Sequence, residues 1–186
     1  MNTIIRADLL RYTGETASGK FLPSLLIPGF RYTYFLRKAQ QFRKTNLLGI
    51  VCRVFLLFDG HFYGFQIPPS TQIGKGLYIG HWGTIVVNGK TIMGDYCNLS
   101  PGVTIGQTNR GKNKGVPVIG NMVWIGTNAV IVGNISIGDN VMIAPNAFVN
   151  FSVPSNSLVI GNPASILPRE DATEGYIDHT STDQSA

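Results

Sequence analysis

The sequence of 186 residues predicts a mainly β protein, a parallel β-helix of about four to five coils with an N-terminal α-helical cap. Three observations predict this fold. An aliphatic residue recurs every six positions through the middle of the chain, asparagine and glycine take fixed places in the same six-residue unit, and apolar residues at helical spacing precede it. Only 13% of the residues are charged and 44% are hydrophobic, which excludes a disordered chain, a coiled coil and a charge-rich helical bundle.

The N-terminal region, residues 1–60, is predicted to be helical. Residues 29–44 have apolar side chains interleaved with Arg and Lys at roughly helical spacing. Asn46 is expected to cap a following helix, which Asp59-Gly60 would end. These helices would cover the open end of a repeat array.

Residues 61–168 are predicted to form the β-helix domain. The aliphatic period of six is interrupted by two extra residues after Ile85 and by a longer insertion, residues 107–118, which is expected to be an extruded loop. A period of six fits neither an α-helix nor a simple alternating strand, and it suits a chain that makes a short strand, turns and repeats. Thirteen positions carry the period: Ile67, Ile73, Ile79, Ile85, Met93, Leu99, Ile105, Ile119, Ile125, Ile131, Ile137, Ile143 and Val149.

Asparagine recurs three positions after the aliphatic residue, at Asn128, Asn134, Asn140 and Asn146. Asparagine and glycine tolerate a positive φ, which a sharp corner between short strands demands. We therefore expect these residues at the corners of the coils, with three hexads closing one triangular turn.

The hexad, in which a small residue often follows the aliphatic one, resembles the hexapeptide-repeat acyltransferases over residues 60–168. The resemblance implies that the coils are left-handed and that acetyl-CoA is the co-substrate. It also implies a homotrimer with active sites at the subunit interfaces.

His81 is the one histidine of the predicted coils and the candidate catalytic residue. It lies in residues 79–87, a segment similar to the catalytic segment of the serine acetyltransferase branch. Residues 64–69 and 99–106 are similar to that branch as well. The resemblance implies that His81 acts as general base while the acceptor hydroxyl attacks the thioester directly. Histidine suits this role because its pKa lies near neutrality.

Three positions depart from the serine acetyltransferases. Gln66 stands where that branch has an aspartate that helps to orient the histidine, Val116 replaces a histidine of the loop, and Gly80 replaces a frequent aspartate. The loss of these polar groups argues against a zwitterionic amino acid as acceptor. Gln66 is nevertheless assigned to the catalytic pair, as an acceptor for the Nδ1–H of His81.

We therefore predict an acetyl-CoA-dependent O-acetyltransferase that acts on a saccharide hydroxyl in capsule, exopolysaccharide or lipopolysaccharide biosynthesis. Serine O-acetyl transfer in cysteine biosynthesis is the alternative. Trp82 is the candidate face on which a sugar stacks, or else a packing residue at a subunit contact. Arg110, Lys112 and Lys114 of the extruded loop would contact coenzyme A phosphates or an acidic sugar, or form a solvated loop.

The resemblance also places coenzyme A along a groove between coils of neighbouring subunits. The matching small residues are Gly106, Gly126, Thr127 and Ala144. Arg169, just past the last coil, is the candidate partner for a phosphate.

Two other kinds of β-helix protein are less well supported. A carbonic anhydrase of this fold holds zinc with three histidines, whereas this chain has His81 in the coils, His61 before them and His179 after them, so we expect no metal. A structural or ice-binding β-helix would have a regular face without a large insertion.

The net charge of +5 is unevenly distributed. Residues 1–58 hold nine basic and two acidic side chains, a net +7, and residues 169–186 hold one basic and five acidic ones, a net −4. The basic helices are expected to present a solvated face, or to rest on an anionic membrane surface, and no nucleic-acid partner is predicted. The polar tail, residues 169–186, is predicted to be flexible or to wrap on a partner.

The sequence also bears on location. Its first residues lack the pattern of a signal peptide, and its longest apolar stretch, residues 47–58, is interrupted by Arg53 and is too short to cross a bilayer. We therefore expect a cytoplasmic protein, with peripheral contact at the inner membrane face as an option.

Overall fold

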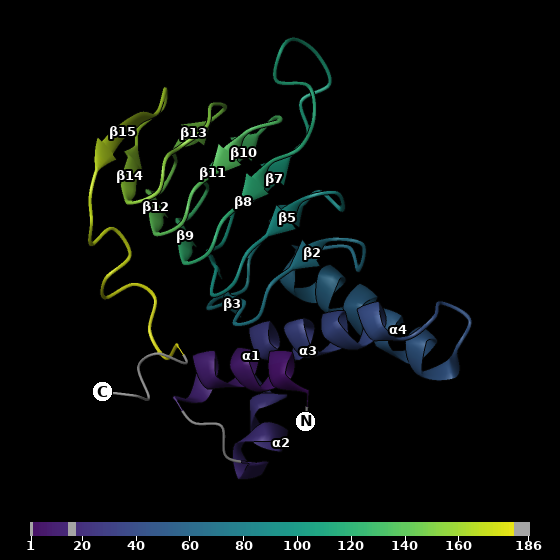
Figure 1. Ribbon diagram of the computed structural model, residues 1–186. Coiled ribbons are helices and arrows are strands. Elements are labelled where there is room, and N and C mark those ends of the chain that lie inside the picture. The colour runs from purple at the N-terminus through teal and green to yellow at the C-terminus, as the bar shows by residue number, and fades with distance from the viewer. Residues whose placement is uncertain (1, 15–17, 181–186) are drawn as a thin grey trace.

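The computed structural model describes residues 2–14 and 18–180, which form a helical cap followed by a β-solenoid (Figure 1). Asn2 begins the first helix, because its side-chain oxygen accepts a 3.0 Å hydrogen bond from the N–H of Ile4. The cap contains α1 (Thr3–Thr13), a 3₁₀ turn (Ser18–Lys20), α2 (Phe21–Ser24), α3 (Pro28–Gln41) and α4 (Leu47–Tyr63).

Helix α4 begins where the sequence predicts but ends later. The side chain of Asn46 accepts a 2.9 Å hydrogen bond from the main chain of the first turn. The predicted end at Asp59-Gly60 is wrong, because the helix continues to Gly64, which caps it at a φ of 79°. Asp59 remains helical because its buried carboxylate pairs with Arg31 at 2.6 Å.

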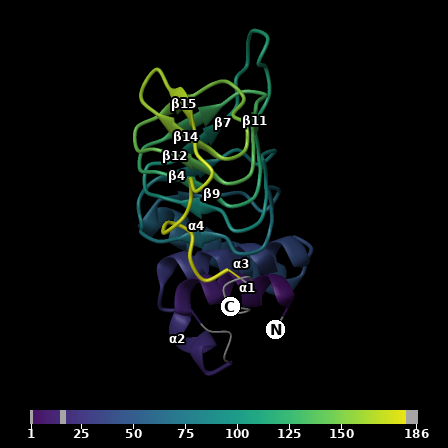
Figure 2. The ribbon, with the colours of Figure 1, turned by 60° about the vertical axis from the view of Figure 1, so that its left-hand side comes forward.

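The solenoid consists of fifteen short strands: β1 (Phe65–Gln66), β2 (Gln72–Ile73), β3 (Tyr78–Ile79), β4 (Ile85–Val87), β5 (Ile92–Met93), β6 (Asn98–Leu99), β7 (Thr104–Gly106), β8 (Val118–Ile119), β9 (Val123–Ile125), β10 (Val130–Val132), β11 (Ser136–Ile137), β12 (Val141–Ile143), β13 (Phe148–Val149), β14 (Ser157–Ile160) and β15 (Ser165–Pro168). They form three sheets, one for each face of the solenoid (Figures 1 and 2).

The order of strands in each sheet confirms the predicted fold class. The first sheet runs β1-β4-β7-β10-β13, the second β2-β5-β8-β11, and the third β3-β6-β9-β12-β14 with β15 added antiparallel at its end. All other pairs are parallel. The chain therefore completes about five turns, consistent with a left-handed β-helix.

The hexad positions fill the centre of the solenoid. Twelve of the thirteen aliphatic side chains are at most 3% exposed, and the thirteenth, Ile73, is half-buried against the same core. The strand register explains this, because Leu99 pairs with Ile79 on one side and with Ile125 on the other. Each inward side chain therefore stacks on its counterpart in the next coil, and burial is continuous along the solenoid axis.

Asparagine forms most of the predicted corners. Asn128, Asn140 and Asn146 have φ values of 60°, 51° and 61°. The prediction is wrong for Asn134, because Gly133 takes the positive φ, 99°, one residue earlier. Glycine adopts this conformation without the steric cost of a Cβ, so the chain turns there before it reaches the asparagine.

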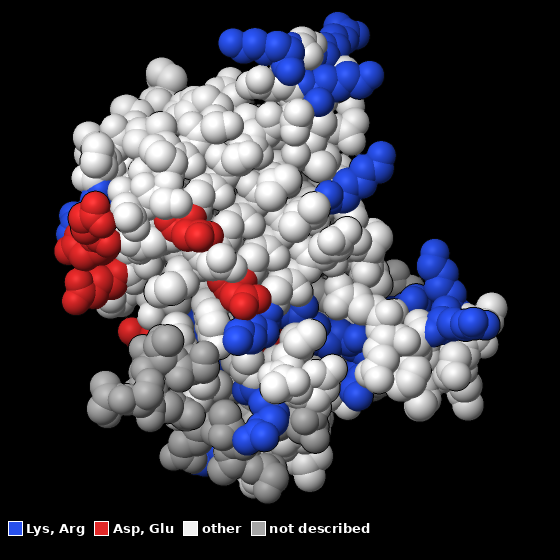
Figure 3. Space-filling model, viewed as in Figure 1, with Lys and Arg blue, Asp and Glu red and all other residues white. Residues whose placement is uncertain are grey.

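The insertion after β7 leaves the solenoid as a protruding loop (Figure 1). Thr108 and Gly115 close its base by exchanging two main-chain hydrogen bonds of 3.0 Å. Arg110, Lys112 and Lys114 are exposed in this loop, and basic side chains gather at its tip in Figure 3.

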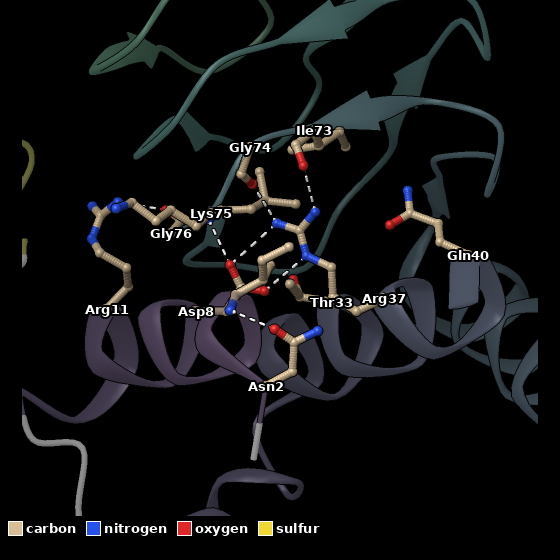
Figure 4. A network of polar contacts seen from close by, with 12 residues as sticks. Asn2, Asp8, Arg11, Thr33, Arg37, Gln40, Ile73, Gly74, Lys75 and Gly76 are labelled. Carbon is tan, nitrogen blue, oxygen red and sulfur yellow. Dashed lines mark hydrogen bonds and ion pairs between the residues drawn. The ribbon is translucent and has the colours of Figure 1, made fainter. Parts of the chain in front are cut away.

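A buried ion pair joins the cap to the first coil (Figure 4). Nε of Arg37 on α3 lies 2.9 Å from a carboxylate oxygen of Asp8 on α1. The same guanidinium donates to the carbonyl of Ile73 at 2.6 Å, and Asp8 accepts from the N–H of Leu77 at 3.0 Å. One pair of charges therefore fixes two helices against the coil that follows them.

The C-terminal segment returns along one side of the solenoid to the cap (Figures 1 and 2). Asn140 donates to the carbonyl of Glu170 at 2.7 Å, and Asn98 donates to the carbonyl of Tyr176 at 2.9 Å. The expectation of a flexible or partner-bound tail is therefore wrong for residues 169–180, which pack on their own chain. The rest of the predicted tail, 181–186, lies outside the described residues.

Within residues 2–14 and 18–180, none of the helices combines the length and the apolar character that a membrane span requires.

Candidate active site

The catalytic candidate His81 lies at a corner of the solenoid, directly after β3. The register of the third sheet aligns Ile79, Leu99, Ile125 and Ile143 in successive coils. The residues that follow them therefore meet at the same corner, and Gly80, Ser100, Gly126 and Ala144 form one column along the solenoid. His81 is exposed at the cap end of this corner.

A cavity of about 410 Å³ opens beside His81. Three separate parts of the chain form its walls: the end of α1, the coils of the third sheet and the C-terminal segment. The residues that line it are Arg11, Tyr12, Tyr78, Gly80, His81, Asn98, Leu99, Ser100, Trp124, Tyr176, Asp178 and His179. Most of these side chains are polar, so the cavity suits a small hydrophilic molecule with a group that His81 can deprotonate.

Tyr12 holds the end of β3, the strand that precedes His81. Its hydroxyl accepts a 2.8 Å hydrogen bond from the N–H of Ile79, two residues before the histidine. Burial raises the pKa of Tyr12 well above its usual value, so the phenol keeps its proton. Tyr12 is therefore a positioning group and not a second base.

Gln66, the predicted partner of His81, lines a different cavity. That cavity, of about 1010 Å³, lies between α4 and the first coils and is mainly apolar. No hydrogen bond joins Gln66 to His81 within the described residues, and the side chain of Gln66 is exposed. Its assignment as a catalytic residue stays a prediction.

Trp82 is not among the residues that line the His81 cavity. Its ring is 66% exposed and stacks on Tyr63 at a centroid distance of 5.5 Å, beside the end of α4. It lines a separate shallow depression with Phe62 and Thr84. The ring therefore belongs to a surface next to α4, and a role in binding the acceptor is not supported by its position in one chain.

The predicted coenzyme positions are divided between two corners. Gly126, Thr127 and Ala144 share the corner of His81, because Ile125 and Ile143 are paired in the register. Gly106 ends β7 in the first sheet, at the corner from which the loop leaves.

The predicted cations lie outside the cavity of His81. Arg169 is half-exposed and pairs with Asp171 at 2.9 Å. Arg110, Lys112 and Lys114 stand in the loop, and none of these four cations lines the His81 cavity.

Neither cysteine offers a nucleophile. Cys97 is fully buried, and burial raises its pKa to about 12, so it is a neutral thiol at physiological pH. Cys52 is buried in α4. Nucleophilic attack through a cysteine thiolate is therefore disfavoured, and direct attack by the acceptor remains.

No three His, Cys, Asp or Glu side chains come together as a metal site in the part of the chain that the structure describes. His61 lies on α4 and His179 on the C-terminal segment, and only the latter shares the cavity of His81.

Sequence reasoning missed several residues of the cavity, among them Arg11, Asn98, Asp178 and His179. Arg11 is one of nine basic residues in the first 58 and carries no motif. The segment that contains Asp178 has no periodicity to place it. Only the return of the chain to α1 brings these residues beside His81.

Comparison with known proteins identifies relatives. A family described as bacterial transferase hexapeptide (six repeats) matches residues 117–150. A serine acetyltransferase of Helicobacter pylori is 32% identical over 154 residues, which cover 83% of this chain and 90% of the relative. One of Synechococcus elongatus is 32% identical over 156 residues, and the chain spans only 64% of its length. The structure of serine acetyltransferase from Brucella abortus in complex with coenzyme A superposes with a TM-score of 0.74 at 28% identity, covering 89% of this chain and 67% of that one.

These relatives correct the predicted acceptor. Because the similar proteins are serine acetyltransferases, the prediction of a saccharide acceptor and of a role in polysaccharide biosynthesis is wrong, and the alternative is better supported. The error has a physical origin. At Gln66, Val116 and Gly80 the chain lacks polar groups that the resemblance assigned to binding an amino-acid acceptor. The cavity contains other polar groups that the sequence pattern did not reveal.

Proposed function

The chain belongs to the serine acetyltransferase family of hexapeptide-repeat acyltransferases, and from this premise we propose that it transfers the acetyl group of acetyl-CoA to the hydroxyl of serine. The observation that carries the proposal is the 32% identity to a serine acetyltransferase over 90% of that protein's length. The polar cavity beside His81 supports it, since it is large enough for an amino acid and the end of an acyl thioester.

His81 is the general base in this mechanism. The imidazole takes the proton of the serine hydroxyl as the oxygen attacks the thioester carbonyl. As the carbon–sulfur bond breaks, the imidazolium returns that proton to the leaving thiolate of coenzyme A. The histidine thus ends the reaction as it began, and no protein nucleophile is needed.

The corner that carries His81 is the proposed path of coenzyme A. Thr127 and Ala144 stand two and three coils beyond the histidine, at roughly 10 and 14 Å if each coil adds about 4.8 Å. Small side chains there leave room for a narrow, flexible arm. We place the phosphates near the exposed cations Arg169, Arg110, Lys112 or Lys114, where charge-assisted hydrogen bonds would hold them.

The proposed assembly is a homotrimer with active sites between subunits. It is supported by the apolar surface of α4, a helix that extends beyond the edge of the solenoid in Figure 1. Leu47 and Leu57 are each 74% exposed on this helix. Exposed apolar area of this extent on one helix is typical of an interface.

The direct test is the release of coenzyme A thiol with L-serine as acceptor. We expect turnover that saturates with both serine and acetyl-CoA, and O-acetylserine as the product. Thiol release with a different hydroxyl acceptor and none with serine would refute the proposal.

A further inference from the structure

The cavity beside His81 contains a buried cation, Arg11, that has no counter-ion among the described residues. Within the described ranges, four charged side chains are buried: Asp8, Arg11, Arg37 and Asp59. Three of them are in ion pairs, Arg37 with Asp8 at 2.9 Å and Asp59 with Arg31 at 2.6 Å. Arg11 is 5% exposed and forms no ion pair with any residue of 2–14 or 18–180. A buried charge is costly unless it is paired, so this arrangement requires an explanation.

Neutral groups hold the guanidinium of Arg11 in place. Its Nε donates to the carbonyl of Asp178 at 2.7 Å, its Nη1 to the carbonyl of Gly76 at 2.8 Å and its Nη2 to Oδ1 of Asn98 at 2.7 Å. It also lies over the ring of Tyr78, 5.4 Å from the centroid. An arginine has five N–H groups, so two remain for another acceptor.

Asp8 and Asp59, the acidic residues of the cap that the structure describes, are both paired with other arginines. Figure 4 shows Arg11 bonded to Gly76 on one side of α1, while the carboxylate of Asp8 faces Arg37 on the other. Burial lowers the pKa of Arg11, and the carboxylate of Asp178 counteracts this only weakly and from beyond ion-pair distance. The positive charge is therefore fixed and desolvated within the cavity.

We propose that Arg11 binds the carboxylate of the acceptor, and that this contact holds the acceptor hydroxyl at His81. The inference rests on the proposed function, because it assumes that the acceptor is an amino acid. It assigns the binding of the carboxylate to Arg11, a residue that no sequence motif indicates. A planar guanidinium with two free N–H groups suits a carboxylate, and the low dielectric of the cavity strengthens the contact. Asp178 lines the same cavity and offers an acceptor to the ammonium group of an amino acid.

The test compares L-serine with L-serinamide, which keeps the hydroxyl and the amine but has no carboxylate. At about pH 6.5, below the usual pKa of an α-amino group, both acceptors carry a protonated amine. We expect the protein to prefer serine by at least 10-fold in kcat/KM. Arg11→Gln should lower kcat/KM for serine by about 100-fold and for serinamide by less than 3-fold, so that the preference disappears. Arg11→Lys keeps the charge and should retain part of the preference.

Arg53→Gln is the matched control. Arg53 also donates to main-chain carbonyls, those of Gly49 and Ala39 at 2.8 Å, but it lies on α4 and outside the His81 cavity. Its variant should keep the preference for serine. An equal loss with both acceptors in Arg11→Gln would indicate a structural role and would overturn the inference.

Two further measurements cover the remaining outcomes. If Arg11→Gln does not fold, as judged by circular dichroism, the comparison of serine with serinamide in the unmodified protein is the test. Equal kcat/KM for the two acceptors contradicts a carboxylate site. If neither acceptor is turned over, the proposed function fails by itself. Thermal stabilisation by L-alanine and not by L-alaninamide would then still support the site, and stabilisation by neither would rule it out.

Discussion

Nη2 of Arg11 donates a 2.7 Å hydrogen bond to the side-chain oxygen of Asn98, although the two residues are 87 positions apart in the chain. The amide nitrogen of Asn98 in turn donates to the carbonyl of Tyr176 at 2.9 Å. This chain of contacts joins α1, strand β6 and the C-terminal segment around one cavity. The cavity beside His81 is therefore assembled from three distant parts of the sequence.

Replacing His81 by alanine should lower kcat by about 100-fold or more, because the acceptor hydroxyl then loses its base. The side chain is exposed, so the free energy of unfolding should change by less than about 0.5 kcal/mol. Steady-state thiol release and urea unfolding measure the two effects. His61→Ala, an exposed histidine on α4 outside the cavity, is the control and should keep its activity. Near-normal turnover in His81→Ala would show that another group is the base.

Cys97→Ala should keep kcat within about 3-fold of the unmodified protein. The thiol is fully buried with a pKa of about 12, so it does not take part in direct attack on the thioester. The loss of its packing should cost about 1 kcal/mol of unfolding free energy. Mass spectrometry of the protein mixed with acetyl-CoA alone should detect no acetylated cysteine. A trapped acetyl-Cys97 with loss of turnover in the variant would contradict direct attack.

How far the sequence predicts this structure depends on whether a repeat is involved. The hexad period predicts the core because each inward residue meets its own counterpart in the next coil, as Leu99 meets Ile79 and Ile125. The repeat pattern does not show which of two neighbouring residues forms a corner, or where a helix outside the repeat ends. The corner is formed by Gly133 and not by Asn134. Helix α4 continues beyond Asp59-Gly60, a dipeptide that usually ends a helix, and the buried Asp59 pairs with Arg31.

Only those residues of the candidate site that lie in a segment resembling the family could be predicted from the sequence. His81 stands out as a lone histidine in a repeat with a recognisable segment. Arg11 and Asp178 come together through the return of the tail, which depends on contacts between aperiodic segments. The incorrect prediction of the acceptor has the same cause. The sequence shows that Gln66 and Val116 replace polar residues of the family, but it does not show that other polar groups lie beside Arg11.

The exposed face of α4 should be buried in an oligomer. Light scattering after size-exclusion chromatography should give three times the chain mass of 20.2 kDa. Val54→Glu with Leu57→Glu should dissociate the assembly and leave the helical signal unchanged, because both side chains are more than half exposed in the single chain. Leu22→Glu on α2 is the matched control, since Leu22 is equally exposed, at 74%, and should leave the trimer intact.

A monomeric unmodified protein would contradict this use of α4 and would leave the membrane surface as the cover for its apolar face. In that case Arg43 and Lys44, which are exposed just before the helix, would contribute electrostatic attraction. Co-sedimentation with anionic vesicles should then be detectable at low salt and weaken as salt is added. Lack of binding at low salt would exclude a membrane role.

Truncation after Ala172 should weaken both the fold and the binding of serine. It removes the main-chain acceptors for Arg11 and Asn98, the buried side chain of Ile177, and the ring of Tyr176, which lies 5.0 Å from that of Trp124. Two hydrogen bonds and one buried aliphatic group together stabilise by on the order of 3 kcal/mol. The KM for serine should rise by at least 10-fold, because one wall of the cavity is lost and water reaches the guanidinium.

The matched control is a chain that ends at Thr180, which retains all of these contacts and should keep both properties. Urea unfolding gives the stability of each chain, and steady-state thiol release gives KM and kcat. If the shorter chain has a higher kcat/KM for serine than the longer one, the C-terminal segment obstructs the cavity instead of completing it. Because the segment carries both Asp178 and the carbonyl that fixes Arg11, we expect the opposite, a loss that appears in KM more than in kcat.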